Sequence, residues 1–168
     1  MNEKSKFLSF SLQWHITSNC ASRCKHCYMY DSSYMAEDCS YQDFADMFAN
    51  VENFFDKYNV KSFSYTLTGG SPLMNKECAD IFRLLHSNSK NIGLLDIPEM
   101  VTDENLALLK QYDIQFYQVS LDGLEKTHDD IRGVGSFKRT IDACRRLYKQ
   151  VGIVPNIMFT LSMDNYGE

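Results

Sequence analysis

Along the chain, segments in which every second residue is apolar alternate with segments in which every third or fourth residue is apolar. Apolar and polar residues alternate in several short segments, and these predict β-strands near residues 10–17, 60–68, 92–97, 114–121 and 154–163. Between them, apolar side chains recur every three or four residues, which predicts helices near 44–58, 78–85, 102–109 and 136–151. Ser40, Thr102 and Ser136 precede three of these helices and are the expected N-caps.

Strands that alternate with helices indicate βαβ units and an α/β fold with a parallel sheet. Buried parallel strands are usually apolar throughout, yet most of these strands keep one polar face. Its members are Gln13, His15, Thr17, Ser62, Ser64, Thr66, Gln118, Ser120, Asp122, Asn156, Thr160 and Ser162. We therefore expect a partial (β/α) barrel with a polar lumen, parallel strands inside and helices outside. The alternative is an open sheet with a polar edge of no special function.

Composition narrows the class of partners. The formal net charge is −5 with no basic stripe, so nucleic acid is not an expected partner. No apolar run approaches the length of a membrane span, and the first residues lack the apolar core of a secretory signal. With six cysteines, these features predict a cytoplasmic protein in a reducing compartment, without a membrane partner.

Three of the cysteines form a CxxxCxxC motif just after the first predicted strand: Cys20, Cys24 and Cys27. Three thiolates in one short loop can hold three corners of a 4Fe–4S cluster and leave one iron open. The alternative is a zinc site with His15 or His26 as fourth ligand, although structural zinc usually takes two separated pairs of ligands. Cys39 is a further conceivable ligand without supporting spacing.

This motif, together with three later segments, resembles the radical S-adenosylmethionine (radical SAM) superfamily. Residues 68–73, TGGSPL, are similar to the family's GGEP segment, and SLDG at 120–123 follows the fourth strand. HDDIRG at 128–133 and GSF at 135–137 complete a run that resembles the peptide- and protein-modifying branch. That branch includes anaerobic sulfatase-maturing enzymes and ribosomal-peptide maturases with SPASM-type extensions. The resemblance extends from about residue 10 to 165.

The resemblance implies cofactors and a reaction. Cys20, Cys24 and Cys27 would bind a 4Fe–4S cluster, which cleaves S-adenosylmethionine (SAM) reductively to a 5′-deoxyadenosyl radical that abstracts hydrogen from a peptide or protein. An electron donor such as flavodoxin or ferredoxin would be a partner. The residues implied to contact SAM are His26, Gly69, Gly70, Ser71, Ser120, Asp122 and Arg132. Among these, His26 would meet the adenine, and Ser120 and Arg132 the ribose and carboxylate part. No residue is assigned as the catalytic group.

The sequence departs from the family pattern in three places. Ser71 replaces the usual carboxylate of the GGEP segment, so a contact with the SAM amino group would fall to backbone carbonyls or to Ser71 Oγ. LDIPE at 95–99 stands where a TNG segment is common. The chain also ends soon after the fifth predicted strand. We therefore expect residues 1–168 to be the N-terminal part of a barrel, with its remainder and any auxiliary-cluster domain absent and activity of the fragment itself open.

The remaining candidates have structural alternatives. Cys78 and Cys144 lie on apolar helix faces and are expected to be core residues, and His86 is expected at a helix surface. His128, Asp129 and Asp122 fit either a functional or a turn-forming role. The alternative reading of the whole chain is a zinc-stabilised binding module without redox chemistry.

Overall fold

The computed structural model describes residues 9–29, 38–60 and 62–168. The strands are β1 (Ser9–Thr17), β2 (Ser62–Gly69), β3 (Asn91–Leu95), β4 (Phe116–Ser120) and β5 (Asn156–Met158). The α-helices are α1 (Tyr41–Lys57), α2 (Cys78–Ser87), α3 (Asp103–Gln111), α4 (Glu125–Arg132) and α5 (Ser136–Arg146). Two 3₁₀ turns (Pro72–Met74 and Pro98–Met100) follow β2 and β3, and a π-helical turn (Leu147–Val151) extends α5.

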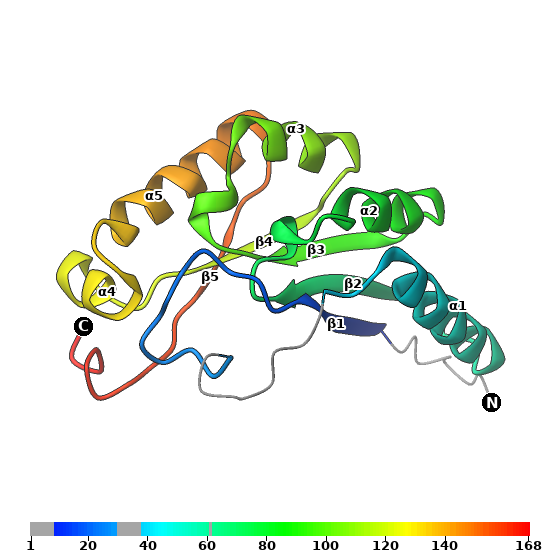
Figure 1. Cartoon of the computed structure of the whole chain (residues 1–168), viewed down its shortest axis with the longest axis horizontal. Coiled ribbons are helices and arrows are strands. Elements are labelled where there is room, and N and C mark those ends of the chain that lie inside the picture. The colour runs from blue at the N-terminus through cyan, green and yellow to red at the C-terminus, as the bar shows by residue number, and fades with distance from the viewer. Residues whose placement is uncertain (1–8, 30–37, 61) are drawn as a thin grey trace, which may run out of the picture.

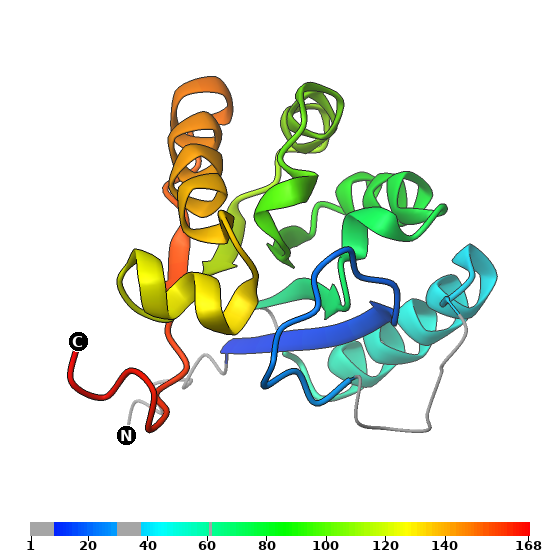
Figure 2. The ribbon, with the colours of Figure 1, turned by 60° about the vertical axis from the view of Figure 1, so that its left-hand side comes forward.

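All five strands lie parallel in one sheet, in the order β1-β2-β3-β4-β5. The helices cover one face of this sheet and form an arc around it, while the cysteine-bearing segment after β1 crosses the sheet toward α4 (Figures 1 and 2). This is the predicted partial barrel, open between β1 and β5. None of the helices in the described residues is both long and apolar enough to span a membrane.

The helix-facing side of the sheet carries the core. The strand residues fully buried there are Ile16, Tyr65, Leu67, Ile92, Leu94, Tyr117 and Val119. The phenyl rings of Phe44 and Phe48 on α1 pack against this layer, as do Phe82 and Leu85 on α2. Alternate residues such as Gln13, His15 and Gln118 face the opposite, polar side, as the sequence pattern predicts.

Two of the three expected helix starts are confirmed. Ser40 Oγ accepts a hydrogen bond from the Asp43 amide at 3.1 Å, and Thr102 Oγ1 accepts one from the Asn105 amide at 3.2 Å. These bonds satisfy amide groups that the first turn of a helix leaves without partners.

The prediction of Ser136 as an N-cap is wrong, and α4 is missing from the prediction. Gly135 occupies the cap position, and the Asp129 carboxylate on α4 accepts from the amides of Gly135 (2.6 Å) and Phe137 (2.8 Å). Ile131 is the only aliphatic residue in α4, so the helix has no apolar periodicity to detect. Ser136 is the first residue of α5 and contacts His128 instead.

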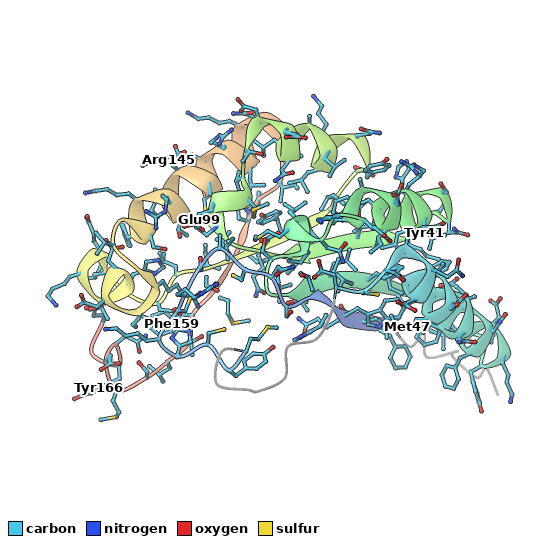
Figure 3. The ribbon with its side chains drawn as sticks, viewed as in Figure 1. Tyr41, Met47, Glu99, Arg145, Phe159 and Tyr166 are labelled. Carbon is cyan, nitrogen blue, oxygen red and sulfur yellow. The ribbon has the colours of Figure 1, made fainter. Side chains whose placement is uncertain are left out.

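The fifth strand is much shorter than predicted. It pairs with β4 only from Asn156 to Met158, because the Thr160 amide donates to the Asp122 carboxylate at 2.8 Å and turns the chain away from the sheet. The apolar residues beyond that point, Phe159 (Figure 3) and Leu161, are exposed.

Candidate active site

A cavity of about 480 Å³ opens at the carboxyl ends of the strands. In parallel α/β folds this end of the sheet is where active sites form. The predicted site residues that line the cavity are Cys20, Cys24, His26, Cys27, Gly69, Gly70, Ser120 and Arg132. Four segments far apart in the sequence therefore meet there. Ser71 and Asp122 lie behind this surface.

The cysteine loop is fastened to α4. The Lys25 amide donates to the Ile131 carbonyl at 2.9 Å, and the Cys27 amide closes a turn onto the Cys24 carbonyl at 3.1 Å. Burial raises the pKa of the Cys24 thiol, the Arg132 charge opposes that rise, and the charges of Cys20 and Cys27 add to it. The three thiols therefore lie close enough to influence one another electrostatically.

Arg132, at the end of α4, brings three parts of the site together. Its Nη1 lies 3.6 Å from Cys24 Sγ, its Nη2 lies 3.3 Å from His26 Nε2, and its Nε donates to Asp122 Oδ2. Because a guanidinium stays charged at any relevant pH, this side chain supplies a fixed positive charge beside the thiols.

The Asp122 carboxylate fixes the position of the Arg132 side chain. The Asp122 side chain is fully buried; besides Arg132 it accepts from the Thr160 amide, and its own amide donates to His128 Nδ1 at 3.0 Å. His128 is also fully buried, with Nε2 3.2 Å from Ser136 Oγ, and burial lowers its pKa. In this arrangement His128 and Asp129 connect β4, α4 and α5 and do not face the cavity.

The two glycines are needed for a contact within the chain. A Cβ on Gly69, whose φ is +126°, would lie 2.2 Å from the Thr17 carbonyl oxygen, and one on Gly70 would lie 2.2 Å from that of Asn19. The Gly70 amide donates to Thr17 O at 2.8 Å and the Ser71 amide to Asn19 O at 2.7 Å. The glycine pair therefore lets the end of β2 pack directly on the backbone that leads into the cysteine loop.

Sequence reasoning did not identify Asp96, which lines the same cavity. It follows β3 directly, and its Oδ1 accepts from Ser71 Oγ at 2.5 Å. Burial raises its pKa to about 6. The sequence does contain a signal for Asp96, because a carboxylate directly after a parallel strand is a candidate site residue. The signal was missed because residues 95–99 differ from the segment that the family pattern has at this place.

Other candidates fall where the sequence predicts. Cys78 is buried in the core, Cys144 packs partly against it, and His86 is exposed. Cys39 is half-buried beside the core, outside the cavity. Tyr28 and His15 also line the cavity, with Tyr28 Oη 3.4 Å from His15 Nε2.

The donor set fits an iron–sulfur cluster with SAM. A 4Fe–4S cluster binds each thiolate at a different iron, so its ligands surround a volume instead of one point. Three thiols, a guanidinium beside them and a carboxylate from the end of β3 line one cavity, and this set matches a cluster and a zwitterionic ligand. In the described ranges, no three His, Cys, Asp or Glu side chains are placed to hold one metal ion.

Curated relatives share this region at low identity. Fe-coproporphyrin III synthase from Methanosarcina barkeri is 23% identical over 153 residues, which cover 90% of this chain and 37% of that protein. The sporulation killing factor maturation protein SkfB from Bacillus subtilis is 24% identical over 163 residues, 96% of this chain and 38% of that protein. The chain thus spans less than two fifths of either relative.

Solved structures share the fold. SuiB from Streptococcus suis, solved bound to S-adenosylmethionine, superposes with a TM-score of 0.67 at 16% identity, covering 90% of this chain and 34% of SuiB. The complex of SuiB with its precursor peptide SuiA gives a TM-score of 0.68 at 16% identity, covering 90% and 33%.

The family model of the radical SAM superfamily matches residues 14–167. That range includes the three motif cysteines and every residue of the cavity described above except Gln13. Members of this family use SAM and a 4Fe–4S cluster, the two groups that the donor set accommodates. The chain belongs to the radical SAM superfamily.

Proposed function

We propose that this chain forms the cofactor-binding part of a radical SAM enzyme that modifies a peptide or protein. The observation that carries the proposal is the convergence of Cys20, Cys24 and Cys27 with Arg132 and the Gly69–Gly70 pair on one cavity. When bound, the cluster and SAM would supply the one-electron chemistry that removes a hydrogen atom from the substrate.

The side chains of this chain bind and orient the two groups. Cys20, Cys24 and Cys27 would be the cluster ligands. The Arg132 guanidinium suits the SAM carboxylate, since its Nη atoms reach toward the cavity while Asp122 fixes its Nε. Asp122 thereby acts on SAM through Arg132 instead of touching it.

The remaining positions surround the rest of the SAM molecule. Ser120 lines the cavity beside Arg132, in keeping with a ribose contact, and half-exposed His26 is available for the adenine. Gly69 and Gly70 line the wall and keep the cysteine loop seated against β2. Ser71 does not line the cavity itself, but its Oγ donates a hydrogen bond to Asp96, which does.

A peptide substrate is favoured over a tetrapyrrole by the charge of the lumen. Some relatives are named as synthases of haem or an iron porphyrin, and another is named for maturation of a sporulation killing factor. Several cations would favour a tetrapyrrole that bears several carboxylates, and Arg132 is the one Lys or Arg among the described residues that line the cavity. Polar, uncharged groups such as Gln13 and Gln118 suit the amides of a peptide. An electron donor such as flavodoxin or ferredoxin would complete the reaction.

The substrate class can be tested in the protein that contains this chain at its full length. After anaerobic reconstitution and reduction, 5′-deoxyadenosine formation would be measured with a candidate precursor peptide encoded beside the gene, and with a haem-precursor porphyrin that bears several carboxylates. Stimulation by the peptide alone supports the proposal. Stimulation by the porphyrin alone contradicts the peptide assignment and leaves the radical SAM chemistry intact.

A further inference from the structure

The cavity contains two opposite fixed charges. Among its described lining residues, Asp96 is the one carboxylate and Arg132 the one guanidinium. Asp96 is supplied by the end of β3 and Arg132 by the end of α4. A ligand that carries both an amino and a carboxylate group, as the methionine part of SAM does, finds a complementary group for each.

Asp96 is held in place by neutral donors. Its Oδ1 accepts from Ser71 Oγ (2.5 Å) and from the Ile97 amide (2.7 Å), and its Oδ2 accepts from the Leu73 amide at 3.1 Å. The Asp96 amide donates to the Gln118 carbonyl at 3.1 Å, which fixes the backbone as well. The carboxylate therefore has one orientation, with 6% of the residue exposed.

Among the described residues, no cationic side chain contacts Asp96. The ionisable groups that bear on it are Glu99 from the turn after β3, Cys78 from α2 and Tyr117 from β4, all of which are acidic. Even with neutral hydrogen-bond donors, a buried carboxylate in such surroundings is costly to ionise unless a cation joins it. A ligand that brings an amino group into the cavity would relieve this cost.

The position of Ser71 connects this carboxylate with the sequence motif. Ser71 stands where the resembling GGEP segment has a carboxylate, and its Oγ lies 2.5 Å from Asp96 Oδ1. A carboxyl group from the β3 end thus reaches the place at which the β2 segment lacks one. Asp96 belongs to the segment at residues 95–99, which is the second departure from the family pattern.

We propose that Asp96 binds the amino group of the methionine part of SAM and that Ser71 is a positioning residue which orients Asp96. The inference rests on the proposed function. It assigns a cofactor contact to a residue outside the family's motifs.

The test compares SAM with an analogue in which hydrogen replaces the α-amino group. Equilibrium dissociation constants of both would be measured on the anaerobically reconstituted full-length protein, for wild type, Asp96→Asn and Ser71→Ala. Glu99→Gln is the matched control, because it removes a nearby negative charge from a side chain that accepts a hydrogen bond from Arg139 on α5 and does not line the cavity. Iron content is measured in every variant.

We expect Asp96→Asn to weaken SAM binding by about 10- to 100-fold, the range of a lost charge-assisted bond. The analogue should bind wild type and Asp96→Asn within about threefold of each other, since it lacks the group that Asp96 contacts. Ser71→Ala should give a smaller loss confined to SAM, and Glu99→Gln should stay within about threefold of wild type for both ligands. Iron content should stay at the wild-type level throughout.

Equal SAM affinity in wild type and Asp96→Asn would overturn the inference while the radical SAM assignment survives. Equal losses for SAM and the analogue would also overturn it, because Asp96 would then shape the cavity without contacting the amino group. If Asp96→Asn fails to fold, Ser71→Ala decides by the same comparison. A wild-type protein that loads iron but binds no SAM would overturn the proposed function itself.

Discussion

The Arg132 guanidinium lies 3.6 Å through its Nη1 from the Sγ of Cys24, although 108 residues separate the two. The contact depends on α4, because this helix carries Arg132. The Ile131 carbonyl of the same helix also accepts a hydrogen bond from the Lys25 amide of the cysteine loop. The short polar helix α4 therefore places Arg132, the residue expected to bind the SAM carboxylate, beside the thiols. Through Arg132 the helix contacts both the cysteine loop and Asp122 after β4.

Arg132→Ala should weaken SAM binding by about 10- to 100-fold, since it removes the charge expected to pair with the carboxylate. It also leaves Asp122 buried without its cation, a loss of about 3–5 kcal/mol in unfolding free energy. Adding Asp122→Asn should recover part of the stability and none of the SAM affinity. Recovery of affinity in the double variant would mean that Arg132 acts only through folding.

Gly70→Ala should lower iron loading, because the new Cβ would meet the Asn19 carbonyl oxygen at 2.2 Å and displace the entry to the cysteine loop. Iron and sulfide content after reconstitution measure this effect. Gly167→Ala is the control, since in the described part of the chain no atom beyond its sequence neighbours lies within 4 Å of its Cβ position. Wild-type iron content in Gly70→Ala would show that the loop tolerates the displacement.

Asp96 should make stability depend on pH in the absence of SAM. Burial raises its pKa from 3.8 to about 6, so its favourable contribution is complete below pH 3.8 and is lost as pH rises through 6. From pH 7 to pH 5, wild type should gain about 1 kcal/mol relative to Asp96→Asn. Urea unfolding at both pH values measures this difference, and a constant difference would contradict the ionisation of Asp96.

The cysteines outside the motif should affect stability and not the cluster. Cys78→Ala should cost about 1–3 kcal/mol, because Cys78 is 3% exposed within the core. Cys144→Ala should cost less, since that residue is only half-buried. Denaturant unfolding gives the stabilities, and iron loading should equal that of wild type. A loss of iron in either variant would show that the ligand set is misassigned.

Much of the framework is readable from the sequence, because it rests on repeated local patterns. The strand alternation around Trp14 and the caps at Ser40 and Thr102 are short-range signals, and the structure confirms each of them. The cysteine loop is likewise recognisable from spacing and from its place after a strand.

The parts that sequence reasoning missed depend on tertiary contacts. Helix α4 has no apolar stripe, and Asp129 caps α5 from a neighbouring helix, which no local motif reveals. The shortness of β5 follows from a hydrogen bond to Asp122, 38 residues earlier. Asp96 joins the site only because β3 lies beside β2, so that its carboxylate reaches Ser71.

The central claim is that Cys20, Cys24 and Cys27 hold a cluster with an open iron that binds SAM. The most direct measurement is the electron paramagnetic resonance spectrum of the reduced, anaerobically reconstituted protein, with and without SAM, alongside iron, sulfide and zinc content. Wild type should show a 4Fe–4S signal that changes when SAM is added, and the Cys20→Ala, Cys24→Ala, Cys27→Ala triple variant should show none. Equal iron in both proteins, or tightly bound zinc in wild type, would contradict the account.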